Sequence, residues 1–116
     1  MTWRRWLFAA VLLFTLGAAL VPNAAAPDLG DGDKVNHIAA FVTLSVAAAW
    51  AWPRARLSTI AVAISAFGAA IEGLQAIPFI ARDAEWADWY ADTAAAVVAL
   101  AVIALIRWLA PTSSAP

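Results

Sequence analysis

Most of the acidic side chains of this chain, and its one histidine, lie in two polar stretches. The first stretch contains Asp33, Lys34 and His37. The second begins with Glu72 and Gln75 and ends in a run of charged residues, namely Arg82, Asp83, Glu85, Asp88 and Asp92. Carboxylates and imidazole can transfer protons or bind cations, whereas ammonium and guanidinium groups bind phosphate or carboxylate. We therefore predict that the two stretches meet in one polar site.

Glu72 is the most informative of these residues because it lies within an apolar segment that runs from Leu57 to about Ile77. A charged side chain at the centre of a membrane helix costs roughly 2.5–3.5 kcal/mol, so it is expected to face protein or water and to have a partner. Lys34 and Arg82 are the basic candidates for that partner. Gln75 follows at i+3 on the same helix face. The alternative is that Glu72 only joins helices.

Two further pairs have the spacing of neighbours on a helix. Asp33 and His37 are four residues apart, and Asp88 and Asp92 repeat this spacing, so each pair is predicted to share a helix face. Each residue also has a structural interpretation. His37 could be a buried structural histidine, Asp88 is favoured near a helix N-terminus, and Arg82 could form a salt bridge instead of binding a phosphate.

The composition predicts a membrane protein, because 65% of the 116 residues are hydrophobic and 13% are charged. Typical soluble domains have roughly 45–50% and 25%. Apolar runs separated by Pro, Gly and charged residues predict one domain over residues 1–110, with helices at about 3–22, 35–52, 57–77 and 87–109, and a disordered tail at 111–116. The first run could also be a cleaved signal peptide, although Pro27 argues against cleavage.

The basic residues predict the orientation, since Lys and Arg are enriched in cytoplasmic loops. One side of the predicted bundle carries Arg4, Arg5, Arg54, Arg56 and Arg107. The other side carries most of the acidic residues, with Lys34 and Arg82, and its headgroup level is predicted to hold Trp86 and Trp89. The fold prediction is an all-α integral bundle of four transmembrane helices in the cell membrane. Both termini are cytoplasmic, and the polar site opens outward.

The order of the polar residues resembles the VanZ-like family of small integral membrane proteins. The pattern reads Asp33-Lys34-x-x-His37-x-x-x-Phe41, then Glu72-x-x-Gln75, then Arg82 and Asp88, and it spans Asp33 to about Val97. Asp92 and Ala95 depart from the pattern, because the family usually has Asn and Gly there. The resemblance implies a polytopic bacterial membrane protein, whose named relative is associated with low-level resistance to the lipoglycopeptide teicoplanin. It implies no established reaction.

The ligand-binding set that the resemblance implies is Asp33, Lys34, His37, Glu72, Gln75, Arg82 and Asp88, to which we add Asp92. The preferred function is to bind or modify a cell-envelope amphiphile, such as a lipid-linked intermediate or a lipoglycopeptide antibiotic. Lys34 and Arg82 would hold its anionic groups. No cofactor is predicted. The absence of cysteine excludes thiolate catalysis, and no nucleic-acid-binding motif is present.

Two other classes of function stay open, and with them the question of whether the protein is an enzyme. An intramembrane hydrolase acting on a lipid headgroup or phosphate would use Glu72 or His37 as a base. It could also hold a divalent cation with His37, Glu72, Asp88 and Asp92, although no compact metal-binding motif is present. A small proton-coupled transporter or scaffold would require a homo-oligomer, because four short helices enclose a narrow pathway.

Overall fold

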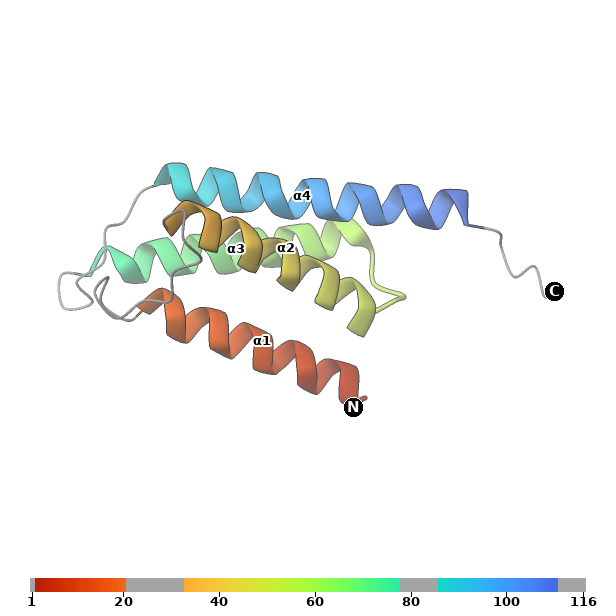
Figure 1. Cartoon of the computed structure of the whole chain (residues 1–116), viewed down its shortest axis with the longest axis horizontal. Coiled ribbons are helices and arrows are strands. Elements are labelled where there is room, and N and C mark those ends of the chain that lie inside the picture. The colour runs from red at the N-terminus through yellow and green to blue at the C-terminus, as the bar shows by residue number, and fades with distance from the viewer. Residues whose placement is uncertain (1, 21–32, 78–85, 111–116) are drawn as a thin grey trace.

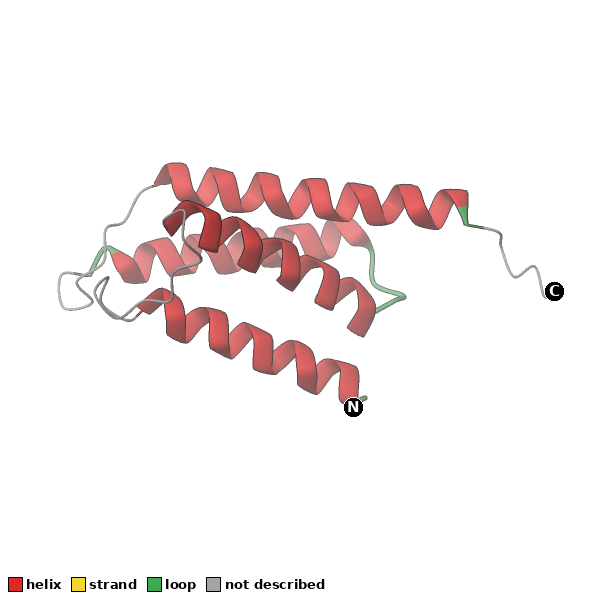
Figure 2. Ribbon diagram, viewed as in Figure 1, coloured by secondary structure: helices red, strands yellow, loops and turns green. Residues whose placement is uncertain are grey.

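The computed structural model describes residues 2–20, 33–77 and 86–110, apart from the side chains of Asp33 and Lys34. These residues form four α-helices (Figures 1 and 2): α1 (Trp3–Leu20), α2 (Asp33–Ala51), α3 (Leu57–Gln75) and α4 (Trp86–Leu109). The all-α prediction is confirmed for this part of the chain, and the helix bounds differ from the predicted ones by no more than two residues. The predicted tail at 111–116 lies outside the described residues.

Successive helices run in opposite directions, so helix ends that are distant in sequence lie together (Figure 1). The starts of α2 and α4 and the ends of α1 and α3 form one end of the bundle, which we call the acidic end because it carries Glu72, Asp88 and Asp92. The opposite end carries Arg4, Arg5, Arg54, Arg56 and Arg107, and we call it the arginine end. Helix α2 packs against all three other helices.

Apolar side chains cover the outside of the bundle, whereas several polar side chains are buried inside it. By length and composition, α1, α3 and α4 can each cross a membrane, and the apolar part of α2, Val35–Ala51, is shorter. Phe14 and Val62 are each 70% exposed, while Glu72 is fully buried. In soluble proteins, large apolar side chains are most often buried and glutamate is mostly exposed. Together with the three candidate spans, this distribution favours a membrane protein.

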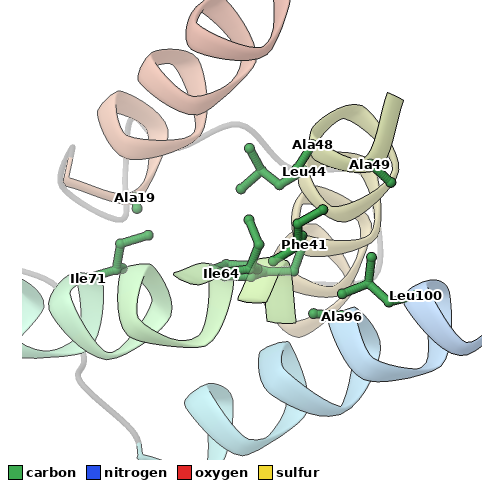
Figure 3. Close-up of a cluster of buried hydrophobic side chains, with 10 residues drawn as sticks. Ala19, Phe41, Leu44, Ala48, Ala49, Ile64, Ile71, Ala96 and Leu100 are labelled. Atoms are coloured by element: carbon green, nitrogen blue, oxygen red, sulfur yellow. The ribbon is translucent and has the colours of Figure 1, made fainter. Parts of the chain in front are cut away.

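The apolar core lies between α2, α3 and α4, with a contribution from Ala19 of α1 (Figure 3). Phe41 and Leu44 of α2 are fully buried in it. Gly68 of α3 makes the close packing possible, because a Cβ atom at this position would lie 3.3 Å from ring atoms of both Phe41 and Trp89. A larger residue at Gly68 would push α3 away from α2 and α4.

Hydrogen bonds also join α3 to α4 near the middle of α3. Trp89 donates through Nε1 to the Ser65 carbonyl at 3.0 Å, and the hydroxyls of Ser65 and Thr93 lie 2.9 Å apart. Trp89 therefore packs into the helix interface beside Gly68, and its position at the headgroup level stays a prediction. Trp86, one turn earlier, is 56% exposed. The small residues of α3 leave room for the Trp89 indole ring between the helices.

At the arginine end, arginine side chains donate hydrogen bonds to the carbonyl groups in the last turn of α2. The last four carbonyls of a helix have no partner within it. In α2 the first of these, that of Ala48, accepts the Trp52 amide at 2.9 Å. The next three accept one arginine each: Ala49 from Arg107 at 3.3 Å, Trp50 from Arg4 at 3.4 Å and Ala51 from Arg5 at 3.4 Å. Positive charge from α1 and α4 thus complements the negative end of the α2 dipole.

Candidate functional site

Three helices bring His37, Glu72 and Asp92 together at the acidic end. His37 lies about one turn into α2, Glu72 one turn before the end of α3 and Asp92 in the second turn of α4. Because α3 runs opposite to α2 and α4, these positions fall at similar depth in the bundle. All three side chains are buried, with exposures of 7%, 0% and 1%. One ligand atom from each residue lies within 4.8 Å of the other two. We call these three residues the His-acid cluster.

The helical period explains why these side chains point inward. In α4 the buried residues Asp88, Asp92, Ala96 and Leu100 follow one another at intervals of four. Residues four apart share one face of a helix, so the two aspartates continue the stripe that packs into the core. In α3, Glu72 and Gln75 likewise continue the buried stripe of Ile64, Gly68 and Ile71. The acidic side chains are therefore held inside the bundle by the same packing that buries the apolar ones.

His37 and Asp92 form the direct contact between α2 and α4 in this cluster. The Nδ1 atom of His37 lies 3.3 Å from Oδ2 of Asp92. When Nδ1 carries the hydrogen, it donates to the carboxylate, which fixes the orientation of the ring. Sequence reasoning predicted that Asp33 shares a helix face with His37, and it gave Asp92 no contact to His37. The four-residue spacing of Asp88, Asp92, Ala96 and Leu100 could have indicated that Asp92 faces inward, but not that it meets His37.

Gln75 has a structural role that the sequence did not indicate. Its Nε2 atom donates to the carbonyl of Ala19 at 2.8 Å, and both residues are buried. Ala19 belongs to the last turn of α1, where carbonyls lack partners within the helix. Gln75 therefore caps α1 from α3. Its Oε1 atom is buried and accepts no hydrogen bond from a described residue, which leaves one acceptor for a ligand one turn away from Glu72.

Asp88 is buried in the first turn of α4, one turn nearer the helix start than Asp92. It does not belong to the set of ligand atoms that lie within 4.8 Å of one another. The four-residue cation site that the sequence suggested is thus reduced to His37, Glu72 and Asp92. The reason is geometric, since one helical turn along α4 moves a side chain by about 5.4 Å.

Of the remaining predicted site residues, Asp33 and Lys34 begin α2. Arg82 lies outside the described residues, as do Asp83 and Glu85, and so do the side chains of Asp33 and Lys34. The predicted roles of Lys34 and Arg82 toward anionic groups stay predictions. Of the eight predicted site residues, the structure brings together His37, Glu72 and Asp92, with Gln75 and Asp88 each one turn away along α3 and α4.

Comparisons of the chain with protein-family models, with curated proteins and with solved structures find no match.

Proposed function

We propose that this chain is a VanZ-like bacterial membrane protein that binds or modifies an amphiphile of the cell envelope at the acidic end of the bundle. In this proposal four helices cross the cell membrane, both termini are cytoplasmic and the acidic end faces outward. The observation that carries the proposal is the burial of His37, Glu72 and Asp92 together, from three helices. Ionisable groups inside a membrane bundle are costly, and they usually mark a functional site.

The chemistry of the cluster favours a ligand that offers hydrogen-bond donors. Ionised carboxylates only accept hydrogen bonds, and the Oε1 atom of Gln75 adds another acceptor nearby. The polar part of a lipid-linked envelope intermediate or of a lipoglycopeptide offers hydroxyl and amide donors. Lys34 and Arg82 are proposed to take the anionic groups of the same ligand, because guanidinium and ammonium groups suit phosphate and carboxylate. The apolar outer faces of the helices would hold its acyl chain.

Isosteric neutral substitutions test whether the carboxylates serve a ligand or only the fold. The variants are Glu72→Gln and Asp92→Asn, and the matched control is Ser45→Ala. Ser45 is also fully buried, but it donates to the Phe41 carbonyl within its own helix. Teicoplanin susceptibility is measured in a host that lacks this gene and carries each variant at equal membrane levels. Thermal unfolding of the purified variants is measured in parallel.

We expect the wild type and Ser45→Ala to lower susceptibility, whereas Glu72→Gln and Asp92→Asn do not. We also expect Glu72→Gln to unfold at or above the wild-type temperature, because removing a buried charge removes its desolvation cost. Full activity of both amide variants would show that the carboxylates are structural. Loss of activity together with a lower unfolding temperature in both variants would also contradict the proposed role.

A divalent cation is the second candidate ligand of the His-acid cluster, and one observation favours it. Two ligands held about 2.1 Å from a tetrahedral ion are about 3.4 Å apart. The separation between Nδ1 of His37 and Oδ2 of Asp92 is 3.3 Å, and Glu72 supplies a third oxygen within 4.8 Å. An ion with three protein ligands keeps a coordination position for substrate. This arrangement would suit a hydrolase that acts on a lipid headgroup or phosphate.

Metal analysis separates this candidate from the first one. The full chain is purified without chelators, incubated with zinc, passed through a desalting column and analysed for bound metal. A catalytic cation site predicts about one ion per chain for the wild type and for Ser45→Ala. It also predicts a loss of binding in His37→Ala and Glu72→Gln. Equal metal content in all four proteins would show that the cluster is not the cation site.

A further inference from the structure

The arginine end contains a cavity that the function proposed above does not use. Its volume is about 460 Å³, and it lies between the start of α1 and the turn that joins α2 to α3. Its lining includes Arg4 and Arg5 of α1, Arg54 of the turn, and the residues Trp3 and Trp52. Three arginines and two tryptophans therefore line one cavity.

No Asp or Glu lies close in the sequence to the residues that line this cavity. Asp and Glu are absent from residues 1–27, 34–71 and 93–116. The described acidic side chains, Glu72, Asp88 and Asp92, are at the opposite end of the bundle. Clustered charges of one sign without counterions raise the local potential and attract ions of the opposite sign. The cavity is thus suited to an anionic ligand.

Two of the three arginines are held in place before any ligand binds. The Arg4 guanidinium lies 4.9 Å from the ring centre of Trp50, and that of Arg5 lies 5.2 Å from the ring centre of Trp52. Each also donates one hydrogen bond to a carbonyl at the end of α2. A guanidinium has five N–H donors, so each keeps donors for another partner. Fixing these side chains in advance reduces the entropy that binding would cost.

The third arginine, Arg54, differs from these two. It is exposed, and no hydrogen bond or ion pair joins its side chain to a described residue. Its removal is therefore expected to change the charge of the cavity without disturbing the packing of α1 on α2. Arg56 lies in the same turn, is also exposed and does not line the cavity, which makes it a matched control.

We propose that this cavity binds the phosphate headgroup of an anionic phospholipid. Arginine is well suited to phosphate because its planar fork can donate two parallel hydrogen bonds to it. The surroundings of the cavity favour a lipid over a soluble phosphate. Trp3 and Trp6 are each 66% exposed at the same end of α1, and Leu7 next to them is 47% exposed. Tryptophan at a membrane surface lies at the headgroup level, and acyl chains can pack on the apolar face beyond it.

This inference requires that the bundle lies in a membrane, but it is independent of the ligand at the acidic end. The protein would hold one lipid of the leaflet that the arginine end faces. The bound headgroup would neutralise the charges of Arg4, Arg5 and Arg54, which no carboxylate of the described residues approaches. It would also link the start of α1 to the turn between α2 and α3.

Native mass spectrometry of the full chain in detergent tests the proposal. Phosphatidylglycerol is titrated into the wild type, Arg54→Gln and Arg56→Gln, and the affinity of the first bound lipid is compared. Phosphatidylcholine serves as the zwitterionic comparison, and glycerol 3-phosphate tests whether a soluble phosphate is sufficient. A basic side chain near an anionic membrane surface contributes about 1 kcal/mol, which corresponds to about a fivefold change in affinity.

We expect Arg54→Gln to bind the first phosphatidylglycerol at least about fivefold more weakly than the wild type. Arg56→Gln should match the wild type, and phosphatidylcholine should bind more weakly than phosphatidylglycerol. Equal weakening in both arginine variants would overturn the proposal, because it would show a diffuse effect of charge. No weakening in either variant would overturn it as well. Tight binding of glycerol 3-phosphate would assign the cavity to a soluble anion and refute the lipid.

Discussion

The hydrogen bond from Gln75 to Ala19 is expected to hold the end of α1 on the bundle, and Gln75→Leu removes it. Leucine has a similar size and no polar atom, so the substitution deletes the donor without opening a large cavity. The bond is short, at 2.8 Å, and its partners are 1% and 7% exposed. After the substitution, the Ala19 carbonyl loses its donor in a place that water reaches poorly.

Gln75→Leu has two opposing effects on stability: it removes the donor to the Ala19 carbonyl, and it removes a buried polar oxygen. A buried backbone group that loses its hydrogen bond costs about 1–3 kcal/mol in soluble proteins, whereas hydrogen bonds between membrane helices average about 0.6 kcal/mol and reach about 1.7 kcal/mol. The same substitution removes the Oε1 atom of Gln75, which accepts no hydrogen bond from a described residue, so part of the loss is offset. We therefore expect Gln75→Leu to destabilise the bundle by about 1 kcal/mol.

Unfolding in mixed micelles with increasing dodecyl sulfate measures this cost through tryptophan fluorescence. The rings of Trp3 and Trp50 are 5.0 Å apart, so the separation of α1 from α2 changes their environment. Thr43→Ala is the control, because its hydroxyl bonds to the Ala39 carbonyl within an exposed part of its own helix. It should shift stability by less than about 0.5 kcal/mol. Equal unfolding midpoints for the wild type, Thr43→Ala and Gln75→Leu would refute the reasoning.

Two further predictions concern packing in the middle of the bundle. Gly68→Ala should leave the bundle about 1–2 kcal/mol less stable than Gly73→Ala does. Both substitutions gain up to about 1 kcal/mol of helix propensity. Only the new Cβ at position 68 would lie 3.3 Å from Phe41 and Trp89, whereas nothing lies within 4 Å of the one at position 73. The same micelle assay measures both variants, and equal effects would contradict the packing around Gly68. Leu44→Ala should cost about 2 kcal/mol, since this side chain is fully buried and the space it leaves cannot collapse completely. An unchanged midpoint would show that the core repacks.

The positions of the helices could be read from local features of the sequence. Long apolar runs favour helices in a membrane, and Pro53 explains why α2 ends at Ala51, since proline disfavours helical geometry in the residue before it. The segregation of arginines from carboxylates also needs no tertiary information. Because successive helices are antiparallel, the chain returns to the same end of the bundle after every second helix. The loop between the first two helices and the loop between the last two therefore lie at one end. This is why the sequence indicated one polar site that included His37, Glu72 and Asp92.

The contacts within that site depend on how the helices are rotated and shifted against one another. A period of 3.6 residues shows which side chains share a face, but it does not show which neighbour that face meets. The pairing of His37 with Asp92 follows from the packing of α2 on α4, and the separation of Asp88 from the cluster follows from their axial offset. The hydrogen bond from Gln75 to Ala19 also depends on helix packing. Its acceptor is a backbone carbonyl, which every residue has, so the sequence does not indicate which carbonyl accepts it. The sequence thus specifies four apolar helices and two oppositely charged ends, while the rotation and axial offset of the packed helices decide which buried polar groups touch.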